Sequence, residues 1–376
     1  MTREQCARIY GFIGRILLAL PLYLLLTGCV TTSSPKTDYS EVFIGRGALL
    51  SGYALWGPEA DRLPEPEDSV LDMTSNMLAF TKENIPRKNA EAVKVKALVK
   101  ALISPDGLNM TYTRTATFTA EEAFLKAEGN CLGFSYLTVL MARQQGLNAV
   151  FQEVDVPPLW SSSREKLIYA TRHVNVRIQS RAGRDFVLDI DQVNVDPAYP
   201  TRIMTDAEAE AHYYSNRGAV FLNQGDMKNA FRYLVKAIRL SPETSYFWSN
   251  LGVFYRQNNL LDHAEMAYHA ALKYDQSNHS ALSNLAILYD IKGDEEEAEY
   301  FAEKARDYQK KNPYFHFFRA QDAYNNGDYE SAVASLEKIT RDKVQVRDKR
   351  FYSLLAESYE MMGENDKASA ILAHLP

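Results

Sequence analysis

The sequence predicts an α+β domain followed by an all-α solenoid of helical hairpins. Strand-like alternation is confined to residues 149–190, whereas the chain after residue 206 has only helical patterns, which recur about every 34 residues. A chain of 376 residues, 46% of them hydrophobic, is long enough for two or three domains. The net charge is −6 and no basic run occurs, so nucleic acid is not expected as a partner.

The N-terminus has the features of an export signal. Three arginines precede an apolar run over residues 16–26, which is too short for a transmembrane helix and is typical of a signal-peptide core. The run ends in Leu-Thr-Gly-Cys, which resembles a bacterial lipobox. The resemblance implies a signal peptide over residues 1–28 and a lipidated Cys29. Val30 then suggests an outer-membrane lipoprotein facing the periplasm; a chance match to the motif is the alternative.

Residues 29–66 are rich in glycine and proline and are interpreted as the lipidated N-terminus and a loop-rich tether. The next part, residues 67–205, is predicted to form the α+β domain. Helical patterns begin at Asp68 and at Asn89, and Thr119 is a candidate cap of a third helix with two glutamates in its first turn.

A helix from about residue 131 to residue 145 carries the first candidate catalytic group. Asn130 is a favourable N-cap and Gly146 a favourable residue after the C-terminus, so the Cys131 thiol falls in the first turn. The helix dipole and free amides there favour the nucleophilic thiolate. The alternative is that Cys131 is a small buried apolar residue.

Two counts favour the catalytic alternative. With Cys6 and Cys29 assigned to the export signal, Cys131 is the only free thiol of the mature chain. His173 is the only histidine before residue 206. One thiol and one imidazole are what a Cys-His nucleophile pair requires, and they are a poor ligand set for a metal. No metal and no cofactor is therefore expected.

Alternating residues predict strands over 149–156, 169–178 and 186–190, with His173 and Asn175 on one face. A hairpin centred on Arg181 would place Asp189 directly opposite His173, with Cβ atoms about 4.5–5.5 Å apart. Asp191 would be the diagonal alternative, and a slip of one residue would turn both aspartates away. A polar pair on a solvated sheet face is the other interpretation.

The order of cysteine at a helix start, histidine on a strand and aspartate on the next strand resembles the transglutaminase-like superfamily, which has a papain-like core. The resemblance covers roughly residues 68–205 and rests on Gly129-Asn130-Cys131, on His173 with Val174-Asn175-Val176, and on Val187-Leu188-Asp189. It implies that Cys131 attacks an amide or ester carbonyl, that His173 transfers the proton and that Asp189 orients the imidazole. The acyl group would then pass to water in a hydrolase or to an amine in an acyltransferase.

The oxyanion of such a reaction needs hydrogen-bond donors. The amide of Cys131 is one candidate. Tyr112 and Asn109 are candidates for the second donor, with purely structural roles as the alternative.

The C-terminal half, residues 206–376, repeats itself about five times. Gly-Asp or an equivalent pair begins at residues 225, 259, 293, 327 and 363, and a small residue precedes each pair by seven positions. The pattern resembles tetratricopeptide repeats, in which such small residues let the two helices of a repeat cross closely. The resemblance implies a groove for a protein or peptide, lined by His212, Tyr246, Arg256, Phe317, Gln321 and Tyr324. A spacer or a dimer scaffold is the alternative.

Together these features predict a lipid-anchored protein of the bacterial cell envelope. It would carry a thiol hydrolase or acyltransferase domain and a repeat arm that binds a partner protein. The competing hypothesis is a catalytically inactive domain that serves, with the repeats, as a binding module or assembly scaffold.

Overall fold

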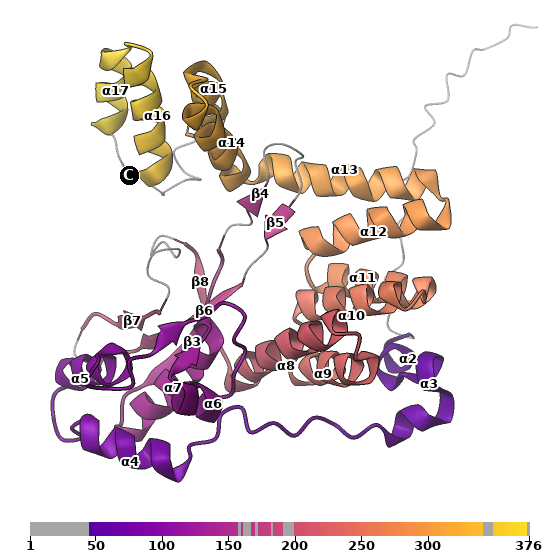
Figure 1. Ribbon diagram of the computed structural model, residues 1–376. Coiled ribbons are helices and arrows are strands. Elements are labelled where there is room, and N and C mark those ends of the chain that lie inside the picture. Colours follow the sequence, from indigo (N-terminus) through magenta and orange to yellow (C-terminus); the bar gives the residue numbers. More distant parts are fainter. Residues whose placement is uncertain are drawn as a thin grey trace, which may run out of the picture. The chain divides into compact units, whose positions relative to one another are not determined.

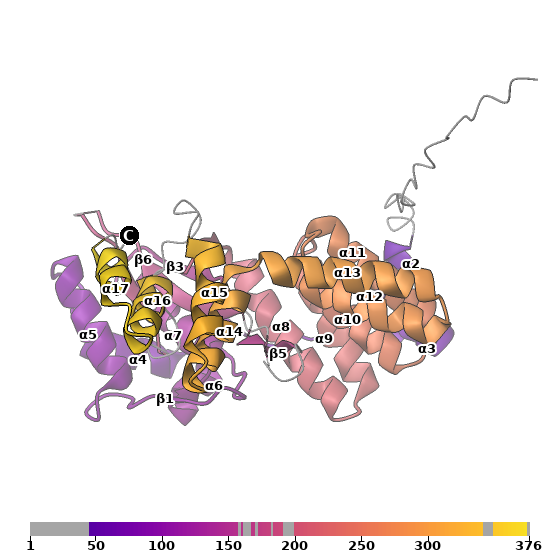
Figure 2. The same cartoon turned by 90° about the horizontal axis from the view of Figure 1, so that it is seen from above.

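The computed structural model of the protein describes residues 45–156, 159–160, 167–169, 172–181, 183–190, 199–340 and 349–373. Three of the sequence predictions lie outside these residues: the signal peptide, lipidation at Cys29 and the alternative aspartate, Asp191. Figures 1 and 2 show a part that mixes helices and strands, followed by successive pairs of helices. Among the described residues, no helix is long and apolar enough to cross a lipid bilayer.

The helices of the mixed part are α4 (Ser75–Asn84), α5 (Glu91–Ile103), α6 (Ala120–Lys126) and α7 (Cys131–Gln144). Two predicted caps are confirmed. Thr119 and Glu122 form a reciprocal capping box at the start of α6. Asn130 caps α7, because its side-chain oxygen accepts from the amides of Leu132 and Gly133 at 3.0 and 3.1 Å.

The predicted helix start at Asp68 is wrong, since α4 begins only at Ser75. The carbonyl of Asp68 accepts from the Tyr214 hydroxyl at 3.1 Å, and the carbonyl of Val70 accepts from the amide of Ala120 at 3.0 Å. These carbonyls are therefore paired with other parts of the chain and not with a helix of their own. Val70 is buried as a loop residue.

Four antiparallel strands form the central sheet in the order β7-β6-β3-β8. Their bounds are β3 (Ala149–Val154), β6 (His173–Ile178), β7 (Phe186–Leu188) and β8 (Thr201–Met204). Two shorter pairs accompany the sheet: β1 (Thr111–Tyr112) with β2 (Glu128–Gly129), and β4 (Leu159–Trp160) with β5 (Leu167–Tyr169). Helix α7 is joined to β6 by the Ser135 hydroxyl, which donates to the carbonyl of Val174 at 3.2 Å.

The predicted hairpin register is wrong by two residues. Val176 pairs with Leu188 and Ile178 with Phe186, so the loop is longer than a hairpin centred on Arg181 allows. The Asp185 carboxylate closes this loop by accepting from the Ser180 amide and the Arg177 guanidinium. A shift of two residues keeps every side chain on its face. Continued by one residue beyond β7, this register sets Asp189 across from Asn175 instead of His173.

The second half of the predicted tether is helical and buried against the repeats. It comprises α2 (Arg46–Ser51), α3 (Tyr53–Trp56) and the 3₁₀ helix η1 (Gly57–Arg62). The Tyr255 hydroxyl donates to the carbonyl of Leu49 at 2.6 Å. Gly52 has a φ of +71°, and a Cβ there would lie 2.8 Å from the Phe231 ring, so only glycine fits without rearrangement.

The repeat helices pair in sequence. Their bounds are α8 (Asp206–Asn223), α9 (Met227–Leu240), α10 (Ser245–Gln257), α11 (Leu261–Tyr274), α12 (His279–Lys292), α13 (Glu295–Lys311), α14 (Pro313–Asn325), α15 (Tyr329–Thr340), α16 (Lys349–Met361) and α17 (Asn365–Leu372). The predicted turns lie between the helices of each pair, and the first residue of each turn has a positive φ: 78° at Gly225, 59° at Asn259 and 77–80° at the last three glycines. The repeat prediction is confirmed.

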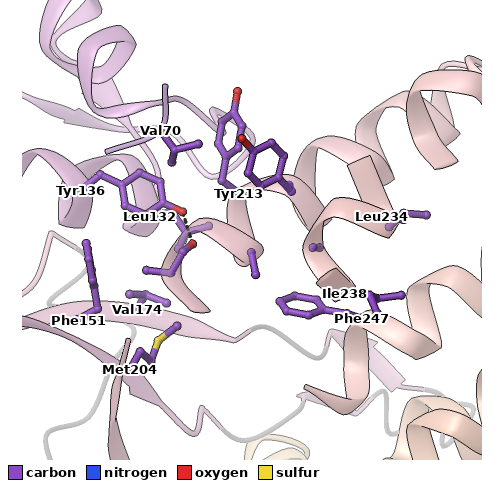
Figure 3. Close-up of a cluster of buried hydrophobic side chains, with 14 of the residues drawn as sticks. Val70, Leu132, Tyr136, Phe151, Val174, Met204, Tyr213, Leu234, Ile238 and Phe247 are labelled. Atoms are coloured by element: carbon purple, nitrogen blue, oxygen red, sulfur yellow. Dashed lines mark hydrogen bonds between the residues drawn. The ribbon is translucent and has the colours of Figure 1, made fainter. Parts of the chain in front are cut away.

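One hydrophobic core runs through the mixed part and the first three repeats. Figure 3 shows Leu132 and Tyr136 of α7 and Val174 of β6 in one cluster with side chains of α8, α9 and α10. The Tyr136 hydroxyl donates to the carbonyl of Ala209 on α8 at 2.7 Å. Helices α14–α17 have a separate core around Phe317 and Phe351. The predicted boundary at residue 205 is therefore not a boundary of the core.

Candidate active site

Cys131 is the first residue of α7 and is half-buried. Its N-cap, Asn130, is fixed in turn by a bond from its side-chain nitrogen to the Thr117 hydroxyl at 3.2 Å. Asn130 takes up the next two amides, those of Leu132 and Gly133. No described residue accepts from the amide of Cys131 itself. A thiol and an unused amide donor thus lie together at the positive end of a 14-residue helix.

His173 lies between Cys131 and Asp189. Its Nε2 is 2.7 Å from Asp189 Oδ2, and its ring lies close enough to the Cys131 side chain for that group to raise the pKa of His173. Because Nε2 faces the carboxylate, Nδ1 is the ring nitrogen left for the thiol. The imidazole is only 5% exposed, at the first residue of β6. The structure thus brings together the three residues that the sequence predicts as a catalytic set.

The electrostatics of this arrangement favour a charged imidazole. Burial lowers the pKa of His173, but the hydrogen bonds to Asp189 and Cys131, together with their negative charges, outweigh it. The pKa is raised from its ordinary 6.5 to about 10. At neutral pH the geometry therefore supports an imidazolium beside the Asp189 carboxylate, which is the cationic partner that a Cys-His nucleophile pair requires.

Asn175 is a fourth member that the sequence analysis did not include. Its side-chain nitrogen donates to Asp189 Oδ2 at 3.0 Å, the same oxygen that contacts His173. Asn175 is 4% exposed, and in the part of the chain that the structure describes its side-chain oxygen accepts no hydrogen bond. The signal available in the sequence was its position, two residues after His173 on the same face of the predicted strand.

The two predicted oxyanion side chains lie differently. Tyr112 pairs with Gly129 across the β1–β2 ladder, two residues before Cys131, and its side chain is 37% exposed. Asn109 is exposed and has a φ of +53° in the segment before β1. No described contact joins either side chain to the thiol, so the Cys131 amide is the donor that geometry supports best.

The predicted groove residues do not form one open surface. Tyr246 is half-buried: its hydroxyl is 2.5 Å from His212 Nε2, and the Arg172 guanidinium lies 4.3 Å from its ring centre. Phe317 is also buried, with its ring 4.7 Å from that of Phe351. Arg256 is half-buried beside the Tyr268 hydroxyl at 3.4 Å. Gln321 is exposed and Tyr324 half-buried, so these two retain accessible surface.

A buried carboxylate joins the sheet to the first two repeats. Glu153 of β3 accepts from Arg202 at 2.6 Å and from Arg172 at 3.4 Å. His212 lies 3.9 Å from the same carboxylate, yet burial lowers the pKa of His212 to about 4 despite the opposing effect of Glu153, with Arg172 and Arg202 adding to the lowering. His212 is therefore neutral at pH 7. Arg172, held by Glu153 and Tyr246, directly precedes His173.

The comparisons with known proteins concern the repeats. A tetratricopeptide repeat family model matches residues 203–373. No curated protein matches the chain. Among solved structures, the chain is similar to the MamA protein at 18% identity, over 43% of this chain and 88% of that one, with a TM-score of 0.25. A tetratricopeptide repeat protein from Parabacteroides merdae matches at 21% identity, over 43% and 77%, with a TM-score of 0.25.

A third solved structure, YrrB, is described as a tetratricopeptide repeat protein with an unusual peptide-binding site. It matches at 15% identity, over 43% of this chain and 83% of that one, with a TM-score of 0.25. The family model and the helix pairs together identify the second half of the chain as tetratricopeptide repeats. Such repeats form a protein–protein interaction arm.

Proposed function

We propose that the protein is a thiol-dependent acyl-transfer enzyme of the bacterial cell envelope, of the transglutaminase-like type, with a repeat arm that binds a protein partner. The observation that carries the proposal is the position of His173, which lies 2.7 Å from Asp189 and close enough to the Cys131 side chain for that group to raise its pKa. A histidine placed near both a thiol and a carboxylate is the arrangement that activates a cysteine nucleophile.

In the proposed reaction the Cys131 thiolate attacks an amide or ester carbonyl, and a carbon–sulfur bond forms. The Cys131 amide stabilises the oxyanion. The His173 imidazolium gives its proton to the leaving amine or alcohol as the carbon–nitrogen or carbon–oxygen bond breaks. Water or an amine then loses a proton to His173, attacks the thioester and releases Cys131 as thiolate. Hydrolase and acyltransferase chemistry share every step except the identity of this acceptor.

Alkylation of Cys131 by iodoacetamide tests the activated thiol without knowledge of the substrate. At pH 7 the His173→Gln variant is expected to react at least roughly ten-fold more slowly than the unchanged protein, because the thiolate loses its cationic partner. His279→Gln, which changes a histidine on α12, is the matched control and is expected to leave the rate unchanged. Equal rates in all three proteins would contradict the enzyme and favour the non-catalytic scaffold.

The proposed location rests on residues 26–29 and is tested separately. Cys29→Ser is expected to move the protein from the membrane fraction to the soluble fraction, because the acyl chains supply the membrane affinity. Cys6→Ser, inside the proposed signal peptide, is the control and should leave the fractionation unchanged. Unaltered membrane association of Cys29→Ser, with no acyl mass on the mature N-terminus, would refute the lipid anchor.

A further inference from the structure

Asp189 lies just beyond the end of the sheet. It is one residue past Leu188, the last residue of β7. The β6–β7 register sets it diagonally to His173 and not opposite to it. Its carboxylate is therefore not directed at the imidazole by the backbone alone.

Asn175 contacts the Asp189 carboxylate directly. Its side-chain nitrogen donates to Asp189 Oδ2 at 3.0 Å, while His173 Nε2 is 2.7 Å from the same oxygen. Two donors on one oxygen restrict rotation of the carboxylate. The amide orientation is set by chemistry, because only the nitrogen of Asn175 can donate to a carboxylate.

The environment of Asn175 indicates that the polar side chain is not there for packing. The residue is 4% exposed, and among the described residues no hydrogen-bond donor reaches its side-chain oxygen. Burying a polar amide is costly unless it is hydrogen-bonded, so an apolar residue would suit this position better if packing were all that mattered. The bond to Asp189 is the one described interaction of the Asn175 side chain that gives it a role.

We propose that Asn175 is a positioning residue, which holds the Asp189 carboxylate against His173 and so makes the candidate site a chain of four groups: Cys131, His173, Asp189 and Asn175. This inference rests on the proposed function. Asn175 touches neither the thiol nor the imidazole in any described contact, so it acts on the reaction through Asp189.

The chain offers a matched control directly across the sheet. Gln152 of β3 pairs with Asn175 in the β3–β6 ladder, is 3% exposed and also has a buried side-chain oxygen without a partner. No described hydrogen bond joins Gln152 to Asp189. Gln152→Leu therefore removes an equally buried amide from the same face without touching the four groups.

The test is the rate of Cys131 alkylation by iodoacetamide in the full chain, measured from pH 5 to pH 9. Asn175→Leu is expected to lower the rate at pH 7 on the order of ten-fold, the scale of one hydrogen bond to a charged group. Gln152→Leu is expected to leave the rate unchanged. In an Asp189→Ala background, Asn175→Leu should have no further effect, since the group through which it acts is gone. If Asn175→Leu does not fold, Asn175→Ala serves in the same comparison.

Equal effects of the Asn175 and Gln152 changes, or an undiminished Asn175 effect in the Asp189→Ala background, would overturn the positioning role. A wild-type rate that does not depend on His173 would overturn the proposed function, and this inference with it. A rate that depends on His173 but not on Asn175 would overturn this inference alone.

Discussion

The first three repeats and the last two relate differently to the mixed part of the chain. Helices α8–α13 share its hydrophobic core, with Tyr136 of α7 bonded to α8 and with α2 buried against α11. Helices α14–α17 have their own core and reach the mixed part through Tyr199, whose ring is 5.6 Å from that of Tyr314. The early repeats are thus structural elements of the mixed part, whereas the described contacts of the late repeats with it are those of α14 and α16 with Tyr199 and of α14 with β4.

Residues at equivalent repeat positions make the contacts of both regions with the mixed part. One such position, which recurs every 34 to 36 residues, is occupied in successive repeats by His212, Tyr246, Ser280, Tyr314 and Arg350. The first two meet Glu153 and Arg172, and the last two meet Tyr199, which accepts from Arg350 at 2.9 Å. One end of this row therefore contacts β3 and the residue that directly precedes His173, and the other contacts the segment before β8. The comparison teaches that much of the expected peptide groove is used within the chain.

Truncation is expected to show the largest difference between the first three repeats and the last two. A chain that stops after residue 205 would expose the core side of α7 and should not fold, because large apolar surfaces lose their cover. A chain that stops after residue 311 loses only the separate core of α14–α17 and should keep a cooperative thermal transition. Circular dichroism and thermal melts of both truncations provide the test. A folded 205-residue chain would contradict the shared core.

The next largest expected effect is a change of folding stability with pH, which comes from His212. The pKa of His212 is about 4 in the folded protein and ordinarily 6.5, so the unfolded chain binds a proton in this interval that the folded chain does not. Stability should therefore fall as pH drops from 6.5 towards 4, by at most about 1.4 kcal/mol per pH unit from this group. His212→Gln should flatten the acid side of a plot of melting temperature against pH.

His173 serves as a control, because its pKa shift changes stability with pH in the opposite direction. Its folded pKa is raised to about 10, so its contribution is present below pH 6.5 and is lost as pH rises towards 10. His173→Gln should flatten the alkaline side and leave the acid side alone. A profile in which both variants change the same side would contradict the assignment of these two groups.

Much of this architecture could be predicted from local sequence signals. The 34-residue period located the repeat turns because each requires a left-handed residue, and Asn259 meets that requirement where the others use glycine. Asn130 and Thr119 identified helix starts for the same reason, since capping depends on neighbouring residues. The parity of the strands placed Asp189 on the face of His173 even though the register was wrong.

The errors come from contacts distant in sequence. Asp185 closes the β6–β7 loop with its side chain, which no turn rule for short hairpins anticipates. Asp68 is held by Tyr213 and Tyr214 of α8, so its helical pattern is not used. Tyr246 matches a groove position by repeat spacing, but the guanidinium of Arg172, a residue more than seventy positions earlier that directly precedes β6, lies over its ring.

A smaller effect, on stability and on Cys131 alkylation, is expected when the tyrosines at two equivalent repeat positions, Tyr246 and Tyr314, are replaced. Tyr246→Leu removes the bond to His212 and the ring under Arg172, at a cost of about 1 kcal/mol in stability. It should also slow Cys131 alkylation, because Arg172 precedes His173. Tyr314→Leu, the matched change at the other end of the row, should leave the alkylation rate unaltered. Equal effects on that rate would show that the two regions do not differ in their link to the site.

The most direct measurement of acyl transfer through Cys131 is capture of the acyl-enzyme. We expect p-nitrophenyl acetate to release a burst of about one equivalent of nitrophenol per protein and to leave an acetyl group on the peptide that contains Cys131, detected by mass spectrometry. Cys131→Ala should abolish the burst, and His173→Gln should slow it. Unmodified Cys131, or a burst of the same size in Cys131→Ala, would contradict an acyl-transfer site at the start of α7.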